Sequence, residues 1–256
     1  MNNNKLTALI ITLNEEKNIR DLMHNLDFAD EIIVVDSFST DKTLEILKEF
    51  SNVKVYQHVF NNFSEQRNIA IDYATNEWVL FTDADERISD DLKQEIQDVL
   101  RSNDTKRGYY LKRKFYFFNE PVNFSGLQSD KNLRLFQKKN AQYHGIVHEK
   151  LNFNDNVGIL NNYLIHYSYA HHQHFKDKVF YYNRLKAVEK LNKGYKPNSV
   201  LAVMHPAYTF LNRYLFRLGF LDGKKGFIIC KVYAQGIKER YNEMLKLYQN
   251  TISSKT

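Results

Sequence analysis

The chain has 256 residues, of which 43% are hydrophobic and 26% are charged, and its formal net charge is +6. This composition fits one globular domain, or one domain with an appendage, and it excludes an intrinsically disordered chain. The single cysteine, Cys230, excludes an internal disulfide framework and fits a reducing, cytoplasmic compartment, and no apolar run reaches the roughly 18 residues of a membrane span.

The first hundred residues alternate between short apolar, β-prone runs and segments with helical spacing of apolar residues. We expect buried strands over residues 6–13, 31–36, 53–58 and 78–81, with a helix after each of the first three. Strands that alternate with short helices predict βαβ units. The sequence therefore predicts an α/β fold with a mainly parallel sheet flanked by helices.

Polar side chains stand where these predicted strands end: Thr12 and Asn14, Asp36, and the turn Thr82–Glu86. Ligands of open α/β sheets bind outside the carboxyl ends of the strands, so we expect these side chains to line one site. The turn contains three carboxylates, which repel one another unless a cation neutralises them. Mg²⁺ or Mn²⁺ suits such oxygen ligands. The alternative is an acidic, solvated turn that caps the following helix.

Two familiar phosphate loops are missing from the chain. It contains neither Gly-x-Gly-x-x-Gly nor Gly-x-x-x-x-Gly-Lys-Ser/Thr. This argues against a dinucleotide-dependent dehydrogenase and against a P-loop nucleoside triphosphatase. If a diphosphate binds at the strand ends, a metal ion on the carboxylates is the simplest way to hold it.

Four segments in order, Thr12–Glu16, Ile33–Asp41, Gln66–Asn68 and Phe81–Glu86, resemble the family 2 glycosyltransferases of the GT-A fold. The resemblance implies a nucleotide-diphosphate sugar donor and Mn²⁺ or Mg²⁺ as cofactor. By the same resemblance, the donor-binding residues are Thr12, Leu13, Asn14, Glu16, Asp36, Arg67, Asp83 and Ala84. Asp83 and Asp85 contact the metal, with Asp85 as the direct ligand. Taken singly, Asp36 can instead be a helix-capping acid and Arg67 a surface charge.

The acceptor half is expected over residues 101–170. Residues 108–118 and 133–136 predict further strands, and Val147-His148-Glu149 resembles the acceptor-side motif of bacterial lipopolysaccharide core glycosyltransferases. We nominate Glu149 as the general base that deprotonates the acceptor hydroxyl, with Glu86 and Asp130 as alternatives. His148 and Glu149 can also be a surface pair at a strand end. The resemblance allows His166 a place on the metal or diphosphate, although a lone histidine is more often structural.

A helical region is predicted over residues 171–256. The histidines at 171, 172 and 174 favour a solvated helix start, because neighbouring positions on a helix point to different faces. From about Ser199 the chain is densely apolar with interleaved Lys and Arg, and 220–227 resembles the closing motif of the same subgroup. Such helices favour contact with the cytoplasmic membrane's inner face; packing on the catalytic domain or on a second subunit is the alternative.

The sequence thus predicts a catalytic GT-A domain over 1–170, with its nucleotide-sugar half over about 1–100, and a helical region after it. The expected activity is an inverting, metal-dependent transfer, UDP-linked by preference, to a lipopolysaccharide-core or similar glycolipid acceptor. The positive charge also fits a nucleic-acid-binding protein, but no helix-turn-helix, zinc or RNP motif is found, and no nucleic acid is expected. A sugar-nucleotide nucleotidyltransferase would usually show a glycine-rich signature where Thr12–Glu16 stands.

Overall fold

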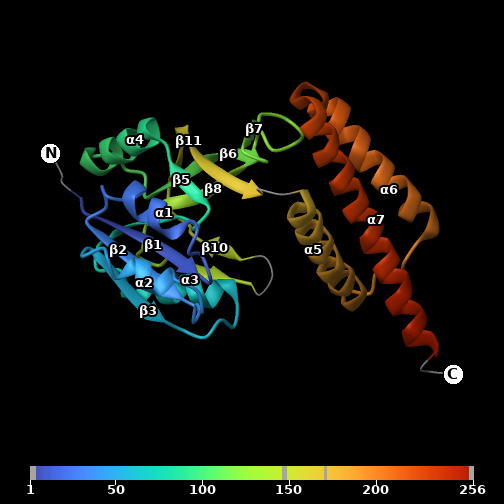
Figure 1. Ribbon diagram of the computed structural model, residues 1–256, viewed down its shortest axis with the longest axis horizontal. Coiled ribbons are helices and arrows are strands. Elements are labelled where there is room, and N and C mark those ends of the chain that lie inside the picture. Colours follow the sequence, from blue (N-terminus) through green and yellow to red (C-terminus); the bar gives the residue numbers. More distant parts are fainter. Residues whose placement is uncertain (1–3, 146–148, 170–171, 254–256) are drawn as a thin grey trace. The chain divides into compact units, whose positions relative to one another are not determined.

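The structure, a computed structural model, describes residues 4–145, 149–169 and 172–253. Contacts divide the chain into two compact units (Figure 1), one of residues 1–113 and 130–166 and the other of residues 114–129 and 167–256. The sequence predicts a domain boundary at residue 170, and the longer stretch of the second unit, which holds the C-terminal helices, begins at residue 167. The segment 114–129, however, groups with that unit and not with the sheet.

The first unit is built on a mixed sheet in the order β3-β2-β1-β4-β8-β6-β11-β5. The strands β1 to β4 are parallel to one another, whereas β8, β6 and β5 each pair antiparallel with a neighbour. The strand bounds are β1 Leu6–Thr12, β2 Glu31–Asp36, β3 Val53–Gln57, β4 Trp78–Phe81, β5 Glu86–Ile88, β6 Gly108–Phe117, β8 Lys131–Gln137 and β11 Val157–Tyr169; the separate ribbon has β9 Gln142–His144 and β10 Lys150–Asn152.

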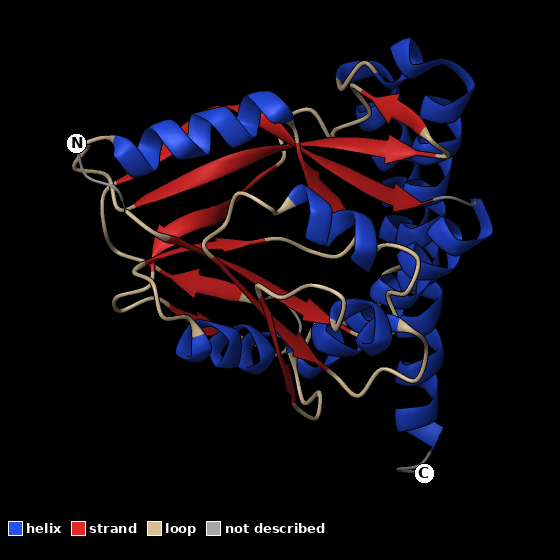
Figure 2. Ribbon diagram, turned by 60° about the vertical axis from the view of Figure 1, so that its left-hand side comes forward, coloured by secondary structure: helices blue, strands red, loops and turns tan. Residues whose placement is uncertain are grey.

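Helices cover both faces of this sheet (Figure 2). Their bounds are α1 Ile19–Asn25, α2 Thr43–Leu47, α3 Phe63–Tyr73 and α4 Asp90–Arg101. Alternate residues of a strand point to opposite faces. Accordingly, Leu6, Ala8 and Ile10 of β1 belong to the core cluster with α1, α2 and α4, whereas Leu9 belongs to the cluster with α3. The predicted α/β class, its four N-terminal strands and the C-terminal helical region are confirmed.

The register of the parallel strands places their carboxyl ends at one edge. Thr12 at the end of β1 pairs with Asp36 at the end of β2, and Leu9 pairs with Phe81, the last residue of β4. The loops after β1 and β2 and the turn after β4 therefore start from the same edge of the sheet.

The second unit contains β7 (Glu120–Val122), α5 (His172–Asn192), α6 (Ser199–Leu211), a π-helical turn η1 (Asn212–Phe216), a 3-10 turn η2 (Gly219–Asp222) and α7 (Gly223–Ser253). Its core includes Phe117, Phe175 and Ile229. Gly236 lets α7 approach α5 closely, since a Cβ there would lie 2.6 Å from Val179 Cγ1. Among the described residues, no helix combines the length and the apolar character that a membrane span requires.

Glu31, at the start of β2, links β1, β3 and the loop that precedes β4. Its Oε2 accepts hydrogen bonds from Thr7 Oγ1 (2.8 Å) and from Thr75 N (2.9 Å), and its Oε1 pairs with Lys54 Nζ at 2.8 Å. Burial by itself raises the pKa of this carboxyl group, but the ion pair and the hydrogen bonds outweigh it and lower the pKa to about 2.

We predict that Glu31 stabilises the fold at neutral pH and that this contribution disappears in acid. Because its folded pKa is depressed, the contribution is present above the unfolded value of about 4.3 and is lost as the pH falls towards 2. Glu31→Gln should lower the unfolding free energy by about 1–3 kcal/mol at pH 7 and by less at pH 3, measured by urea denaturation. Glu45→Gln, at an exposed position of α2, is the control. Equal losses for Glu31→Gln at both pH values would contradict this account.

Candidate functional site

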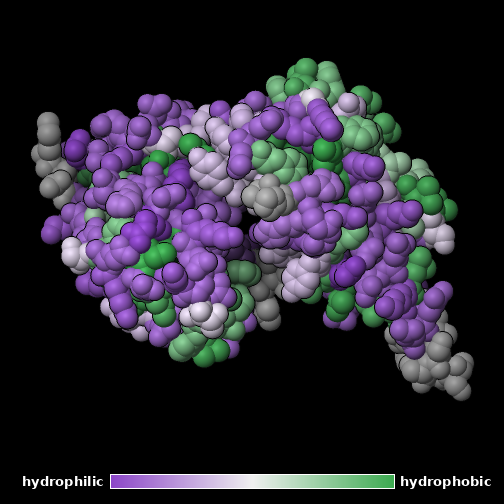
Figure 3. Space-filling model, in the orientation of Figure 1, coloured by the Kyte–Doolittle hydropathy of each residue, from purple (hydrophilic) through white to green (hydrophobic). Residues whose placement is uncertain are grey.

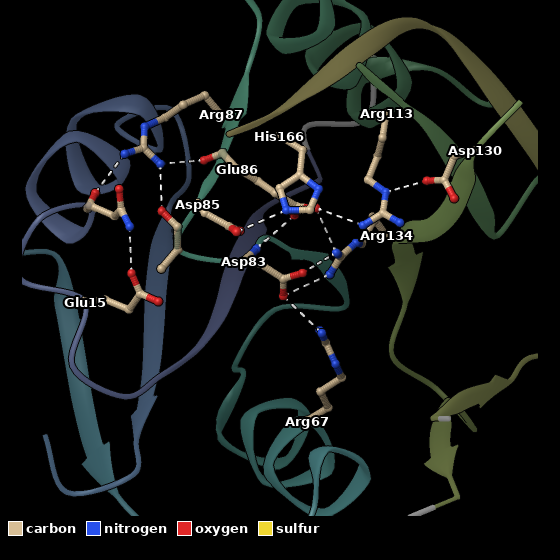
Figure 4. Close-up of polar contacts among 12 residues, drawn as sticks. Glu15, Arg67, Asp83, Asp85, Glu86, Arg87, Arg113, Asp130, Arg134 and His166 are labelled. Carbon is tan, nitrogen blue, oxygen red and sulfur yellow. Dashed lines mark hydrogen bonds and ion pairs between the residues drawn. The ribbon is translucent and has the colours of Figure 1, made fainter. Parts of the chain in front are cut away.

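Asp83 lies in the turn between β4 and β5 and is held by two arginines. Arg67 Nη2 donates to its Oδ1 at 3.0 Å, and Arg134 Nη2 donates to its Oδ2 at 2.5 Å (Figure 4). Although burial opposes ionisation, the two guanidinium groups hold the pKa of Asp83 well below its usual range. Asp83 is therefore an ionised carboxylate whose two oxygens already accept charge-assisted hydrogen bonds.

Glu86 holds the same turn from inside the protein. Its side chain is completely buried, and its carboxylate accepts from the backbone N of Asp83 at 3.0 Å and from Arg134 Nη2 at 3.0 Å. Arg113 lies 3.5 Å from it and also pairs with Asp130 at 2.6 Å. Burial raises the pKa of Glu86 despite the nearby arginines. The complete burial of Glu86 keeps an acceptor hydroxyl away from it, whereas Asp130, 33% exposed and paired with Arg113, stays an alternative base.

Asp85 and His166, two of the predicted metal-contacting residues, lie side by side. His166 stands on β11, in register with Glu86 on β5, and its Nε2 is 3.1 Å from Asp85 Oδ2. A carboxylate oxygen and an imidazole nitrogen are ligands that suit a divalent transition metal such as Mn²⁺. In the described part of the chain, no group of three or more His, Cys, Asp or Glu side chains could hold a metal ion. Two donors alone leave most of an ion's coordination positions open, and Mg²⁺-type sites often fill such positions with water and substrate phosphates.

Arg67 links the predicted donor site to the predicted base. Its side chain is 8% exposed, and its Nε lies 3.6 Å from Glu149 Oε1 while its Nη2 binds Asp83. The guanidinium group also lies over the rings of Phe81 and Tyr143. Arg67 is thus a buried site residue of α3 and not a surface charge, and it brings Glu149 into the same cluster as Asp83.

These side chains line a cavity of about 520 Å³ within the first unit. Its walls include Arg67, Asp83, Arg134, Tyr143 and Glu149. The volume lies within the range of small-molecule sites, about 300–1,000 Å³. The arginines in this wall can bind anionic groups of a ligand, and the two carboxylates can accept hydrogen bonds from its hydroxyl groups.

The predicted nucleotide residues of the first two loops are drawn together by hydrogen bonds between the loops. Asn14 N donates to Ser39 Oγ at 2.8 Å, and Asn14 Oδ1 accepts from Thr40 N at 2.8 Å. Glu16 Oε2 accepts from Lys42 N at 3.1 Å. These contacts set the shape of the pair of loops next to the sheet edge.

Asp36 is completely buried, and its Oδ2 accepts from Ser39 N at 2.9 Å, so this acid caps its own turn. Thr12 and Ala84 are also buried, whereas the side chain of Leu13 is 52% exposed. Contact of these residues with a nucleotide stays a prediction. His148 and His171 lie outside the described residues.

Arg134 is the site residue that sequence reasoning missed. It is 4% exposed in the middle of β8, between Leu133 and Leu135. A charged residue inside an apolar strand is a usable signal, because a buried guanidinium needs acidic partners. The three carboxylates at the end of β4 were the available partners.

Several proteins that resemble this chain are named glycosyltransferases. The family model described as "Glycosyl transferase family 2" matches residues 7–151. An uncharacterized glycosyltransferase of Rickettsia bellii is 29% identical over 90% of this chain and 82% of its own length. The lipopolysaccharide core biosynthesis glycosyltransferase LpsC of Rhizobium meliloti is 26% identical over 92% of this chain and 93% of its own. Among solved structures, S. aureus TarS 1–349 has a TM-score of 0.48 at 18% identity, over 96% of this chain and 92% of that one.

We predict that removing Arg134 destabilises the unit strongly. Arg134→Met keeps most of the volume but leaves the buried Glu86 without its nearest cation, which typically costs about 3–5 kcal/mol. Adding Glu86→Gln should restore part of the loss in a double-mutant cycle. Arg101→Met, an exposed arginine of α4, is the matched control. The account is contradicted if Arg134→Met and Arg101→Met have the same urea midpoint.

Proposed function

This chain belongs to glycosyl transferase family 2 and is a glycosyltransferase; we propose that it transfers a sugar, with inversion, from a nucleoside-diphosphate donor to a glycolipid or glycan acceptor. The observation that supports this best is that Asp85, paired with His166, and the arginine-held Asp83 share the turn after β4, and that Arg67 links Asp83 to Glu149. We take UDP as the nucleotide because of the family resemblance of the four N-terminal motifs.

In this proposal the donor diphosphate lies at the turn after β4. Asp85 and His166 would hold Mn²⁺ or Mg²⁺, which when bound supplies positive charge to the leaving diphosphate. Asp83 remains the third predicted metal contact, but its two arginine partners favour a different role. Held by Arg67 and Arg134, it has a fixed position from which it can accept a hydrogen bond from a donor hydroxyl.

Glu149 is the proposed general base. It lines the same cavity as Asp83 and is 26% exposed, so an acceptor hydroxyl can reach it. As the acceptor oxygen forms its bond to the anomeric carbon, the bond to the diphosphate breaks and the hydroxyl proton passes to the Glu149 carboxylate. Arg67 Nε, 3.6 Å from Glu149 Oε1, helps to hold this carboxylate at the cavity wall.

For the acceptor, we propose a lipopolysaccharide-core or similar bacterial surface glycolipid. The name of the Rhizobium meliloti relative supports this class of acceptor. Such a substrate would place the enzyme at the inner face of the cytoplasmic membrane.

The helical unit has a surface that suits this location. Figure 3 shows apolar residues gathered on α6 and on the neighbouring end of α7. Apolar residues that are more than half exposed in this region are Val200, Val203, Met204 and Tyr208 on α6, Phe216 on η1 and Leu221 on η2. Exposed basic residues, Arg217, Lys224, Lys231 and Lys238, lie on the same unit. We propose that this surface binds anionic lipid.

For the donor site, we predict that UDP binds more tightly with Mn²⁺ and that Asp85→Ala loses this dependence, as measured by calorimetry. Glu149→Gln should keep UDP binding but slow the release of UDP from sugar donors in the presence of acceptor about 10²–10⁴-fold. Asp98→Ala, exposed on α4, serves as the control and should change neither quantity. Salt-sensitive binding of oligonucleotides without any UDP binding would instead favour a nucleic-acid-binding protein.

For the membrane surface, we predict sedimentation with vesicles that contain phosphatidylglycerol. Phe216→Ser should reduce the partition coefficient about tenfold or more, because burying a phenylalanine side chain contributes about 1.5–3 kcal/mol. Ile159→Ser, also exposed but on β11 of the first unit, is the matched control. Unchanged partitioning of Phe216→Ser would exclude this surface.

A further inference from the structure

The helical unit contains a cavity of its own that the transfer reaction does not use. It measures about 330 Å³ and lies among α5, α6, η1 and α7. The polar groups in its wall include Lys186 from α5, Thr209 from α6, Arg213 from η1 and Arg240 from α7, together with Tyr182 and Tyr233. All of these residues belong to the same compact unit.

Three cations line this cavity, and none of its lining residues is acidic. Arg240 donates from Nε (3.1 Å) and Nη2 (2.7 Å) to Asn183 Oδ1, which is a neutral amide oxygen. Asn183 is itself buried and donates from Nδ2 to Val179 O, so this oxygen is held towards Arg240. The acid next to Arg240 in sequence, Glu239, pairs instead with the exposed Arg184 at 2.7 Å.

The other two cations also lack a carboxylate partner in the described part of the chain. Arg213 donates to the backbone oxygen of Ser125 at 2.7 Å and stacks on the ring of Tyr233, with its Cζ 3.9 Å from the ring centroid. Lys186 forms no ion pair with a described carboxylate, although Glu189, three residues further along α5, is close enough to favour its charged form and partly offsets the effects of burial and Arg240. Burial and the nearby Arg240 lower the pKa of Lys186, and burial lowers that of Arg240.

Like charges that are partly removed from water repel one another, and an anion placed between them relieves both the repulsion and the desolvation. The protein groups in the cavity wall indicate which class of anion fits. Guanidinium groups match the oxygens of a phosphate bidentately, an ammonium adds a compact charge, and the Thr209 hydroxyl adds a further donor. The cavity is larger than a phosphate ion needs, and its tyrosine rings offer apolar faces to an attached carbon skeleton.

We propose that this pocket binds a phosphomonoester, through Lys186, Arg213 and Arg240, at a site separate from the donor site. A lipid headgroup and a soluble phosphorylated sugar or glycerol share this chemistry. The inference does not depend on the proposed transfer reaction.

The test uses the full-length chain and inorganic phosphate, titrated by calorimetry. Lys186→Gln should weaken phosphate binding at least tenfold, and Lys186→Arg should recover most of it. Arg184→Gln removes one positive charge from the same helix at an exposed position and should leave the affinity unchanged. Equal weakening by Lys186→Gln and Arg184→Gln would overturn the proposal.

A second measurement needs no variant. Acetic anhydride labelling followed by mass spectrometry should show that phosphate protects Lys186 at least fivefold, while the exposed Lys193 is not protected. Absence of protection would overturn the proposal. Repeating the labelling with glycerol phosphate and with phosphatidic acid vesicles identifies the source: protection by vesicles alone indicates a lipid headgroup, and protection by glycerol phosphate indicates a soluble ligand.

Discussion

The geometry of the catalytic unit depends on buried charges at the end of β4. Glu86 is completely buried and Arg134 is 4% exposed, so each needs an oppositely charged partner, and the two lie 3.0 Å apart. Their contact joins β5 to β8, and Arg134 also reaches Asp83, which Arg67 holds from α3. The turn after β4 is thereby tied to three other elements. If the donor diphosphate binds at this turn, as we propose, it meets charges already in position, which is the condition for electrostatic stabilisation of a leaving group.

Much of this arrangement could be predicted because it follows from local patterns. Apolar runs of four to eight residues indicated the parallel strands, and the register of β1, β2 and β4 brings Thr12, Asp36 and the carboxylate turn to one edge as expected. The pairing of Asp85 with His166 is a different case, because 81 residues separate them. It depends on the antiparallel pairing of β5 with β11, and nothing local in either strand encodes that register.

Other features were out of reach because they depend on tertiary packing. Segment 114–129 groups with the helical unit because Asp222 accepts hydrogen bonds from the backbone N of Asn123 and of Phe124, a contact across about a hundred residues. The Asp36 carboxylate accepts a hydrogen bond from Ser39 N in its own loop. The sequence motif alone could not show whether Asp36 caps this loop or contacts a nucleotide. Arg134 was overlooked because the predicted strand 133–136 was interpreted from its three apolar residues, although its one charged residue was the informative position.

The central claim is that the Asp85–His166 pair, beside the arginine-held Asp83, forms the diphosphate end of a nucleotide-sugar site. The most direct measurement is the anomalous scattering of Mn²⁺ in crystals grown with UDP. The account predicts one strong peak within coordination distance of Asp85 and His166, with the diphosphate oxygens completing the ion's ligands and the Arg67–Asp83–Arg134 contacts intact. A peak coordinated by Asp83 with its arginines displaced, or UDP bound away from the carboxyl ends of β1, β2 and β4, would contradict it.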